Sequence, residues 1–495
     1  MRTTDNHPLR RAYHVVRRLP GVSNAWRKID TGAIPDEAEF VRYVERKGQF
    51  GPSADHDPGV LPPVVDFDSE DFFPNLLARI AACEPTPQAG DAIVLINNGL
   101  SAGGAERQIV NTLTGLKQRG VDATFIGEKL SAAPGHDFHL ATLRQAGVSA
   151  LALEQLSRPG KQLFNFISRP VAEQLFRISP SMLLEILDMT RMLRAIRPRV
   201  VHLWQDETSI KHSISAMLAG APRIVLSGRN INPTHFGYHH AFMRPAYRGL
   251  LNQPGVVFSN NSHAGARSYA DWLGTDASRI RVVHNGIDFS DWPKFDEALR
   301  TSTRQALGVS PLEKLVLGVF RLSEEKRPLL WADVAAATLK TNNAVRFAIA
   351  GDGPMRPDLV RRLAELGIAD KVQLVGQRQD VGALFMASDV FLLASAHEGV
   401  PNVLIEAQYY GRPVLTTRAG GAPEAVAGGE TGRISAAEDA ASLARQLSDL
   451  LGDQAFADRA RQQGPAFVAK AFSIDRMIED TLALYDAGTP GATRG

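Results

Sequence analysis

The chain of 495 residues has only one cysteine, Cys83. A single thiol excludes an intrachain disulfide and a zinc cluster built from cysteines, and this scarcity is typical of a reducing compartment. An excess of charge of one sign is also lacking, since 55 basic residues nearly balance 53 acidic ones. Proteins that bind nucleic acids carry an excess of positive charge. We therefore expect no nucleic-acid partner.

Long hydrophobic runs are missing as well. No stretch reaches about 18 uninterrupted apolar residues, the length that a spanning helix requires. The N-terminal stretch MRTTDNHPLRRAYHVVRRLPG lacks the apolar centre of a signal peptide. These absences lead us to expect a cytoplasmic protein. The chain is too long for one ordinary hydrophobic core, which predicts at least two domains.

Residues 1–88 differ from the rest and are predicted to be an N-terminal extension. They are rich in proline, charge and aromatic residues, and their start is basic, with Val15, Leu19 and Trp26 between the basic residues. Two alternatives remain open for this start. The first is a membrane-surface segment attracted to anionic lipid on the inner membrane face. The second, which we favour, is a solvated helix packed on the main body.

From Asp91 onward, short apolar runs alternate with amphipathic stretches of helical period. The runs are typical of buried parallel strands, and their alternation with helices predicts an α/β fold with two Rossmann-like, doubly wound parallel sheets. The domains are predicted at residues 89–300 and 301–472. Ligands of such sheets bind beyond the carboxyl ends of the strands, here in the crevice between the domains. The apolar runs that mark the strands lie at residues 92–96, 122–126, 200–204, 224–226, 256–259, 281–284, 315–320, 346–350, 372–375, 390–394 and 414–417.

Two glycine-rich loops follow predicted strands. GLSAGGAER (Gly99–Arg107) opens a helix, and glycines there allow a ligand to approach the positive end of that helix. Tight packing of strand on helix is an equally good explanation. GDGPMR (Gly351–Arg356) resembles the start of a dinucleotide fingerprint, but no acid follows at the distance that holds a ribose. This argues against a nicotinamide dehydrogenase and favours a tight turn.

Two further stretches place charged residues at the ligand edge. In FRLSEEKRP, Arg321 follows a strand and Lys326 precedes a helix. This placement favours a phosphate site. The alternative is a solvated loop in which these cations pair with the neighbouring glutamates. In AHEGVPNVLIEAQYYG, Glu398 lies in a strand-to-helix loop, and Glu406 lies one turn past Asn402 on the same helix face. Glu406 could also be an ordinary solvated helix residue.

Taken together with HNGID (284–288), QLVGQRQDV and the terminal FSIDRMIEDTLALY, these motifs resemble in order and spacing the retaining family-4 glycosyltransferases of the GT-B fold. The resemblance covers residues 92–485. It implies that residues 473–495 form a C-terminal helix packing back towards the first domain, followed by a tail. It also implies a sugar transferase of the kind found in capsule and exopolysaccharide gene clusters.

The resemblance implies a role for each matching residue. Arg321 and Lys326 match the cations that hold the donor diphosphate and stabilise the departing nucleotide. Glu398 matches the glutamate beside the donor sugar, and Glu406 the one that accepts the ribose hydroxyls. His202, placed at the end of the strand VVHLW, matches a histidine beside the transferred sugar, with a core histidine as the alternative. The other matching donor-binding positions are Gly103, Gly104, Gln377, Arg378, Gly399, Val400, Pro401 and Asn402.

No carboxylate is evidently placed as a covalent nucleophile, so we do not expect the two-carboxylate mechanism of glycosidases in this protein. DFD (Asp66–Asp68) looks like a metal-binding D-x-D motif, but it lies outside both predicted sheets and is interpreted as surface charge. We expect no catalytic metal and no cofactor other than the nucleotide sugar itself. Retention of anomeric configuration is implied by the family alone.

The expected donor is a uridine diphosphate sugar, and the expected acceptor is a glycan or a lipid-linked sugar. Leu203–Pro233 is also similar to transferases of Vi-type capsule systems, which use uridine-linked amino sugars. Arg229, Asn230 and Asn232 would then border the acceptor, although capping and turn roles suit the asparagines equally well. Alternatives for the whole chain are a GT-B epimerase or phosphorylase, and a non-catalytic scaffold of a capsule assembly complex.

Overall fold

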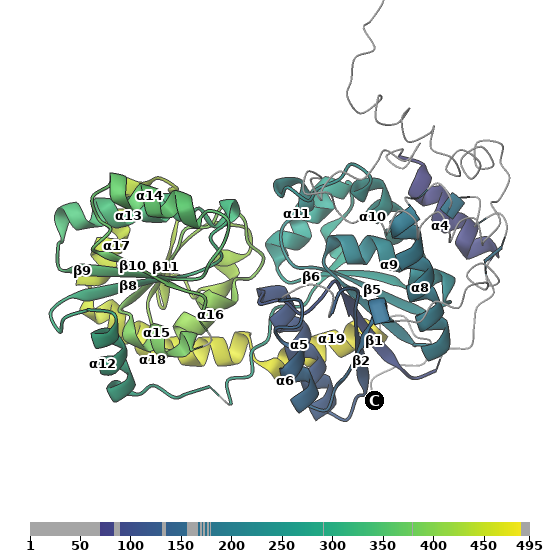
Figure 1. Ribbon diagram of the computed structural model, residues 1–495, viewed down its shortest axis with the longest axis horizontal. Coiled ribbons are helices and arrows are strands. Elements are labelled where there is room, and N and C mark those ends of the chain that lie inside the picture. Colours follow the sequence, from purple (N-terminus) through teal and green to yellow (C-terminus); the bar gives the residue numbers. More distant parts are fainter. Residues whose placement is uncertain are drawn as a thin grey trace, which may run out of the picture.

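The computed structural model describes residues 70–83, 90–130, 135–155, 167–168, 171, 174–175, 178, 180–290, 292–378 and 380–486. Two α/β domains lie side by side, each with a central parallel sheet between helices (Figure 1). This confirms the predicted pair of doubly wound sheets. The basic start and the DFD motif lie outside the described residues.

The first domain contains a seven-stranded sheet with the order β3-β2-β1-β4-β5-β6-β7, and every neighbouring pair is parallel. Its central strands are buried along their whole length, which explains their continuous apolar runs. The strands are β1 (Ile93–Asn97), β2 (Ala123–Gly127), β3 (Ser149–Ala152), β4 (Val200–Trp204), β5 (Arg223–Gly228), β6 (Val256–Asn260) and β7 (Ile280–Val282).

Helices on both faces cover this sheet. They are α4 (Phe72–Cys83), α5 (Gly104–Gln118), α6 (Leu140–Gln145), α8 (Pro180–Ile196), α9 (Asp206–Leu218), α10 (Met243–Leu251) and α11 (His263–Leu273), with short 3₁₀ turns η1 (Leu153–Gln155), η2 (Pro233–His235) and η3 (Ala277–Arg279). Helix α4 comes from the stretch predicted as an extension. It packs on α10 and α9 and adds Phe73, Leu76 and Leu77 to the core of the first domain.

The second domain has a six-stranded parallel sheet with the order β10-β9-β8-β11-β12-β13. Its strands are β8 (Lys314–Val319), β9 (Val345–Ala350), β10 (Val372–Gly376), β11 (Val390–Leu393), β12 (Val414–Thr417) and β13 (Gly432–Ser435). Its helices and turns are α12 (Glu297–Ala306), η4 (Glu324–Lys326), α13 (Pro328–Thr341), α14 (Arg356–Glu365), α15 (Val381–Ala387), α16 (Asn402–Tyr409), η5 (Ala422–Ala425), α17 (Ala440–Gly452) and α18 (Gln454–Ala471).

The chain passes between the domains twice, and the two passages lie against each other. The first follows β7, and the second joins α18 to the last helix, α19 (Ile474–Asp486). The backbone N–H of Ile287 donates to the carbonyl of Phe472 at 3.0 Å, and Ile287 forms a bridge with Ser473. Helix α19 then packs on α5 in the first domain.

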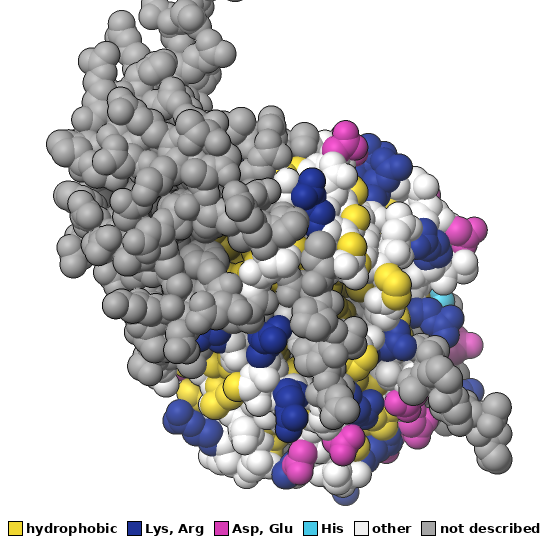
Figure 2. All heavy atoms as spheres, turned by 90° about the vertical axis from the view of Figure 1, so that its right-hand side faces the viewer, with side chains coloured by type: hydrophobic (Ala, Val, Ile, Leu, Met, Phe, Trp, Pro, Cys, Tyr) yellow, Lys and Arg dark blue, Asp and Glu magenta, His cyan; other side chains and the backbone are white. Residues whose placement is uncertain are grey.

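Among the helices in the described ranges, none is both long enough and apolar enough to cross a bilayer. On the part of the first domain visible in Figure 2, basic and acidic side chains are interspersed with neutral and hydrophobic ones.

Asp389, just before β11, anchors α12 to the second domain. Its carboxylate accepts hydrogen bonds from Arg300 at 3.0 Å, from Arg304 at 2.9 Å and from the backbone N–H of Leu315 at 2.7 Å. Burial alone would raise the pKa of Asp389, but the Leu315 N–H and the two guanidinium groups lower it below its usual value. The folded domain therefore holds this group ionised.

Replacing Asp389 with asparagine should destabilise the second domain by about 3 kcal/mol, because two partly buried guanidinium groups lose their counter-ion. A thermal melt should show this as a fall of about 6–12 °C in Tm. The deficit should be full above about pH 4 and shrink as acid protonates the native carboxylate, whose folded pKa is lowered. Asp358→Asn, which breaks an exposed pair with Arg361, should change Tm little.

Candidate active site

The strand order reverses at one point in each sheet, and the loops at these points face the domain boundary. The reversal falls between β1 and β4 in the first sheet and between β8 and β11 in the second. Parallel sheets bind ligands beyond the carboxyl ends of the strands at such reversals. The loop after β1 holds Gly103, the loop after β8 holds Arg321 and Lys326, and the loop after β11 holds Glu398. Most of the predicted site residues therefore lie at the two reversals.

Lys326 and Glu398 are brought together from the loops after β8 and β11. The ammonium nitrogen of Lys326 lies 2.6 Å from Oε1 of Glu398, whose residue is only 5% exposed. The neighbouring Arg327, with a left-handed backbone (φ 51°), donates hydrogen bonds to the carbonyls of Ala394 and Ser395 at 2.7 Å each. Arg327, which the sequence analysis overlooked, thus fixes the Lys326 loop against the Glu398 loop.

Arg321 is exposed at the end of the same loop, which rests on the glycines of GDGPMR. Gly351 has φ 136°, and a Cβ atom there would lie 1.9 Å from the carbonyl oxygen of Phe320. A Cβ on Gly353 would meet the carbonyl of Leu322 at 2.5 Å. The tight-turn interpretation of these glycines is confirmed, because they let the loops after β8 and β9 pack backbone to backbone.

Glu406 lies in α16, points across the domain boundary and is 2% exposed. It forms an ion pair with Arg107 of α5 in the first domain. The alternative of a solvated glutamate is therefore wrong. Arg107 is a second residue that sequence reasoning did not single out, although it ends the quoted GLSAGGAER motif. Its position one turn into a helix after a glycine-rich loop is the signal that could have identified it.

The N-termini of α5 and α16 meet at the boundary (Figure 1). The side-chain amide of Asn402, the first residue of α16, donates to the carbonyl of Gly104 at 3.3 Å. The side-chain amide of Gln108 in α5 donates to the side-chain oxygen Oδ1 of Asn402 at 3.2 Å. Gly103 precedes α5, and a Cβ there would clash with the Glu106 carboxylate at 2.1 Å. A side chain at this position would therefore displace the Glu106 carboxylate.

A polar network from the first domain supports the loop that leads into α16. Asn285, in the HNGID motif, donates to the carbonyl of Val400 at 2.8 Å and to Asn402 at 2.7 Å. Arg229 donates to the Asn285 oxygen at 2.6 Å, and its guanidinium lies 4.4 Å from the ring centre of Trp204. A Cβ on Gly399 would lie 2.4 Å from the carbonyl of Arg229, so glycine permits this contact. Pro401 is the N-cap residue of α16.

The prediction for His202 rested on a wrong position. The residue is in the middle of β4, not at its end, and it is 3% exposed in the core. Its Nδ1 lies 2.9 Å from the hydroxyl of Tyr485 in α19. Burial and the nearby Arg229 lower the pKa of His202 to about 3, so the imidazole is neutral. The structure does not bring His202 together with Lys326 and Glu398.

Gln377 and Arg378 lie beyond the end of β10, at the outer edge of the second sheet. Both are exposed, and the Arg378 guanidinium binds Asp380 at 2.7 Å. The expected role of this pair uses the backbone, and it stays a prediction. Asn232 caps η2 by accepting from the Thr234 N–H at 3.1 Å, which confirms the capping alternative for that residue.

The charges at the boundary are arranged as in an anion site. Two helix N-termini carry positive partial charge, and Arg107, Arg321 and Lys326 add three cations. Glu406 and Glu398 neutralise Arg107 and Lys326 within the protein. A diphosphate with hydroxyl groups nearby has the right chemistry to replace these internal pairs, since its oxygens accept from cations and helix N–H groups while its hydroxyls donate to carboxylates.

Two family models match the chain in succession. The model described as Glycosyltransferase Family 4 matches residues 102–291, within the first domain. The model described as Glycosyl transferases group 1 matches residues 313–453, within the second domain. Each match thus coincides with one of the two parallel sheets.

Curated relatives match over different lengths. The Vi polysaccharide biosynthesis protein VipC/TviE of Salmonella typhi is 29% identical over 405 residues, covering 78% of this chain and 70% of that protein. A D-inositol 3-phosphate glycosyltransferase of Nocardia farcinica is 34% identical over 238 residues. That match covers 46% of this chain and 51% of the Nocardia protein, about half of each.

Solved structures share the fold at low identity. Anabaena HepE in complex with UDP and glucose has a TM-score of 0.65 at 20% identity, with 80% of this chain and 99% of that chain covered. Sucrose-phosphate synthase of Thermosynechococcus elongatus has a TM-score of 0.60 at 18% identity, covering 80% and 98%. The expected GT-B fold is confirmed. The two family models match in chain order on this fold, so the chain carries the two domains of a glycosyltransferase, a Family 4 domain followed by a group 1 domain.

Proposed function

We propose that the protein transfers a sugar from a uridine diphosphate sugar to a glycan or lipid-linked acceptor, with retention of anomeric configuration, in the synthesis of a bacterial surface polysaccharide. One observation carries this proposal. Helices α5 and α16 present their N-termini to each other across the domain boundary, with Asn402 bonded to Gly104 and with cations on both sides. Such an arrangement favours a bound diphosphate.

Donor binding would exchange internal ion pairs for contacts to the ligand. The diphosphate lies between the two helix N-termini and takes contacts from Arg321 and Lys326. Glu406 then accepts hydrogen bonds from the ribose hydroxyls, which requires Arg107 to leave it or share it. Glu398 stays beside Lys326 and faces the donor sugar. In this exchange each buried carboxylate keeps a hydrogen-bond partner.

Transfer then depends on stabilising the leaving group. The bond between the sugar C1 and the diphosphate oxygen breaks, and the acceptor oxygen bonds to C1 on the same face. The departing phosphate takes the acceptor proton. Lys326, Arg321 and the helix N-termini stabilise the negative charge that develops on the nucleotide. Glu398 forms an ion pair with Lys326. We therefore assign it the role of orienting this cation, and not that of a nucleophile that attacks C1.

The relatives support the choice of donor and pathway. HepE was solved with UDP and glucose and with UDP-glucose, and VipC/TviE is a Vi polysaccharide biosynthesis protein. A lipid-linked acceptor would bring this enzyme to the inner membrane face from the cytoplasm. The positive charge of the site comes from side chains and helix ends, so we infer that transfer needs no metal ion.

Calorimetric titration with UDP, GDP, ADP and CMP should show tightest binding of UDP. Glu406→Gln should weaken UDP binding about 10- to 100-fold, because a charged acceptor for the ribose hydroxyls becomes a neutral amide. Glu365→Gln, on the exposed side of α14, should leave the affinity unchanged. Binding of none of the four nucleotides would favour the scaffold alternative instead.

Lys326→Ala should lower kcat about 100- to 1,000-fold, because the leaving diphosphate loses a cation that acts mainly in the transition state. Transfer is measured from the UDP-sugar that binds best, and Tm is measured in parallel to separate catalysis from folding. Lys340→Ala removes a lysine from the last turn of α13 and serves as the matched control. Normal turnover of the Lys326 variant would remove this residue from its proposed role.

The same transfer assay should proceed at an undiminished rate in excess EDTA. Lys326, Arg321 and the N-termini of α5 and α16 supply the positive charge that a metal ion would otherwise provide. A rate that falls at least tenfold on chelation and recovers with Mg²⁺ would contradict the metal-independent mechanism.

A further inference from the structure

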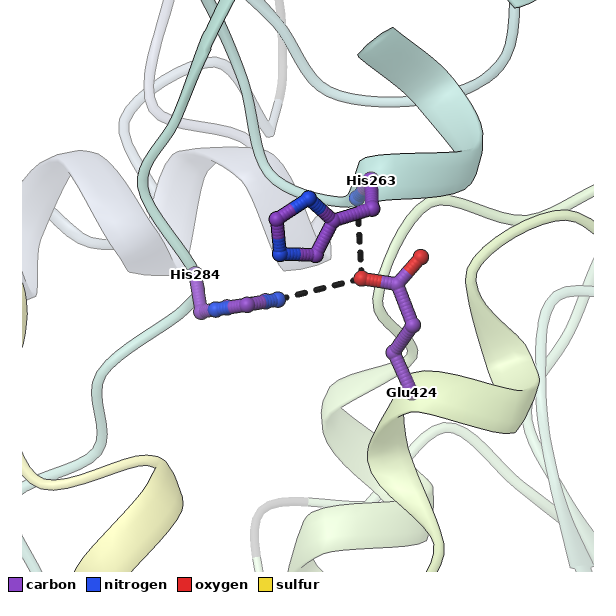
Figure 3. Close-up of side chains that lie close together, drawn as sticks. All are labelled: His263, His284 and Glu424. Carbon is purple, nitrogen blue, oxygen red and sulfur yellow. Dashed lines mark hydrogen bonds and ion pairs between the residues drawn. The ribbon is translucent and has the colours of Figure 1, made fainter. Parts of the chain in front are cut away.

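Three potential metal ligands converge at the domain boundary, outside the proposed donor site (Figure 3). His263 is the first residue of α11, and His284 follows β7, so both belong to the first domain. Glu424 lies in η5 of the second domain. One nitrogen or oxygen from each side chain lies within 4.8 Å of those of the other two.

The carboxylate of Glu424 is held in a fixed orientation. Its Oε2 accepts a hydrogen bond from the backbone N–H of His263 at 2.8 Å, and its Oε1 accepts one from Ala264 at 2.8 Å. The second domain thus supplies a cap for the N-terminus of α11. Hydrogen bonds to a carboxylate also orient it as a metal ligand and strengthen the site that it completes.

Two of the three ligand atoms already have the spacing of a metal site. Nε2 of His284 lies 3.1 Å from Oε2 of Glu424. Ligand atoms on one tetrahedral zinc ion lie about 3.3 Å apart, given zinc–ligand bonds of about 2.0–2.1 Å. The His263 ring is exposed, with its centre 5.5 Å from that of His284. Rotation of this exposed side chain closes the remaining distance.

We propose that His263, His284 and Glu424 form a zinc site that joins the two domains, with water as the fourth ligand. Two imidazoles and one carboxylate suit zinc, whereas Mg²⁺ and Ca²⁺ select oxygen ligands. The ion would lie between His284 and Glu424, where a hydrogen bond now joins the two side chains. The proposal does not depend on the donor or the acceptor, because none of these residues has a role in sugar transfer.

A consequence follows from the origin of the ligands. Because they come from both domains, the complete site exists only when the domains are in contact. Zinc therefore stabilises this arrangement by an amount that grows with the logarithm of its concentration above the Kd. The η5 loop is also tied to the donor loop, since the N–H of Gly421 donates to the carbonyl of Glu398 at 3.2 Å. A bound ion would hold both loops against the first domain.

The test is calorimetric titration of zinc chloride into the full chain, after removal of any histidine tag and treatment with a chelator. We expect one zinc ion per chain. His263→Ala and Glu424→Gln should each weaken binding at least about tenfold, and Mg²⁺ should produce no binding. His263→Ala removes an exposed ring while leaving the backbone bond to Glu424 in place, so it guards against a folding defect.

His235→Ala is the matched control, because it removes another exposed histidine outside the cluster and should leave zinc affinity unchanged. Two results would overturn the proposal. One is the absence of zinc binding to the wild-type chain. The other is equal affinity in wild type and Glu424→Gln, which would show that the second domain contributes no ligand.

Discussion

Two helix N-termini, one from each domain, meet at the boundary, and their combined positive partial charge is stabilised by nearby negative charge. In this protein the negative charge comes from two carboxylates: Glu406 forms an ion pair with Arg107, and Glu398 forms one with Lys326. Both glutamates are buried, which is costly for a carboxylate that lacks a partner. The glycines at the start of α5 and the asparagine at the start of α16 follow from the same constraint, because they let the two ends approach without filling the space between them.

The boundary contrasts with the cores on either side of it. Each sheet is packed by large apolar clusters, whereas the contacts near the site are amides, ion pairs and backbone groups, including Asn285, Asn402 and Gln108. Polar contacts of this kind exchange readily with water or ligand, while apolar cores do not. The domains can therefore separate and close again without disturbing their interiors, and the internal ion pairs give the closed arrangement a stable form without ligand.

Much of the fold could be predicted because buried parallel strands appear in the sequence as continuous apolar runs, as in IVLIN and VVHLW. The loops after β8 and β11 were identified for the same reason, since each of these loops follows such a run. The pairing of Arg107 with Glu406 could not be predicted, because the two are 299 residues apart and meet only when the domains pack. The burial of His202 could not be predicted, because Tyr485 of α19, which contacts it, lies 283 residues further along the chain.

Helix α19 adds Met477, Ile478, Leu484 and Tyr485 to the cluster that also contains Leu95 of β1 and Leu113 of α5. The interior of the first domain is therefore completed by a helix that follows the whole second domain in the sequence. During translation the strands of the first domain emerge before α19, so part of their apolar surface has no cover until the second domain has also been synthesised.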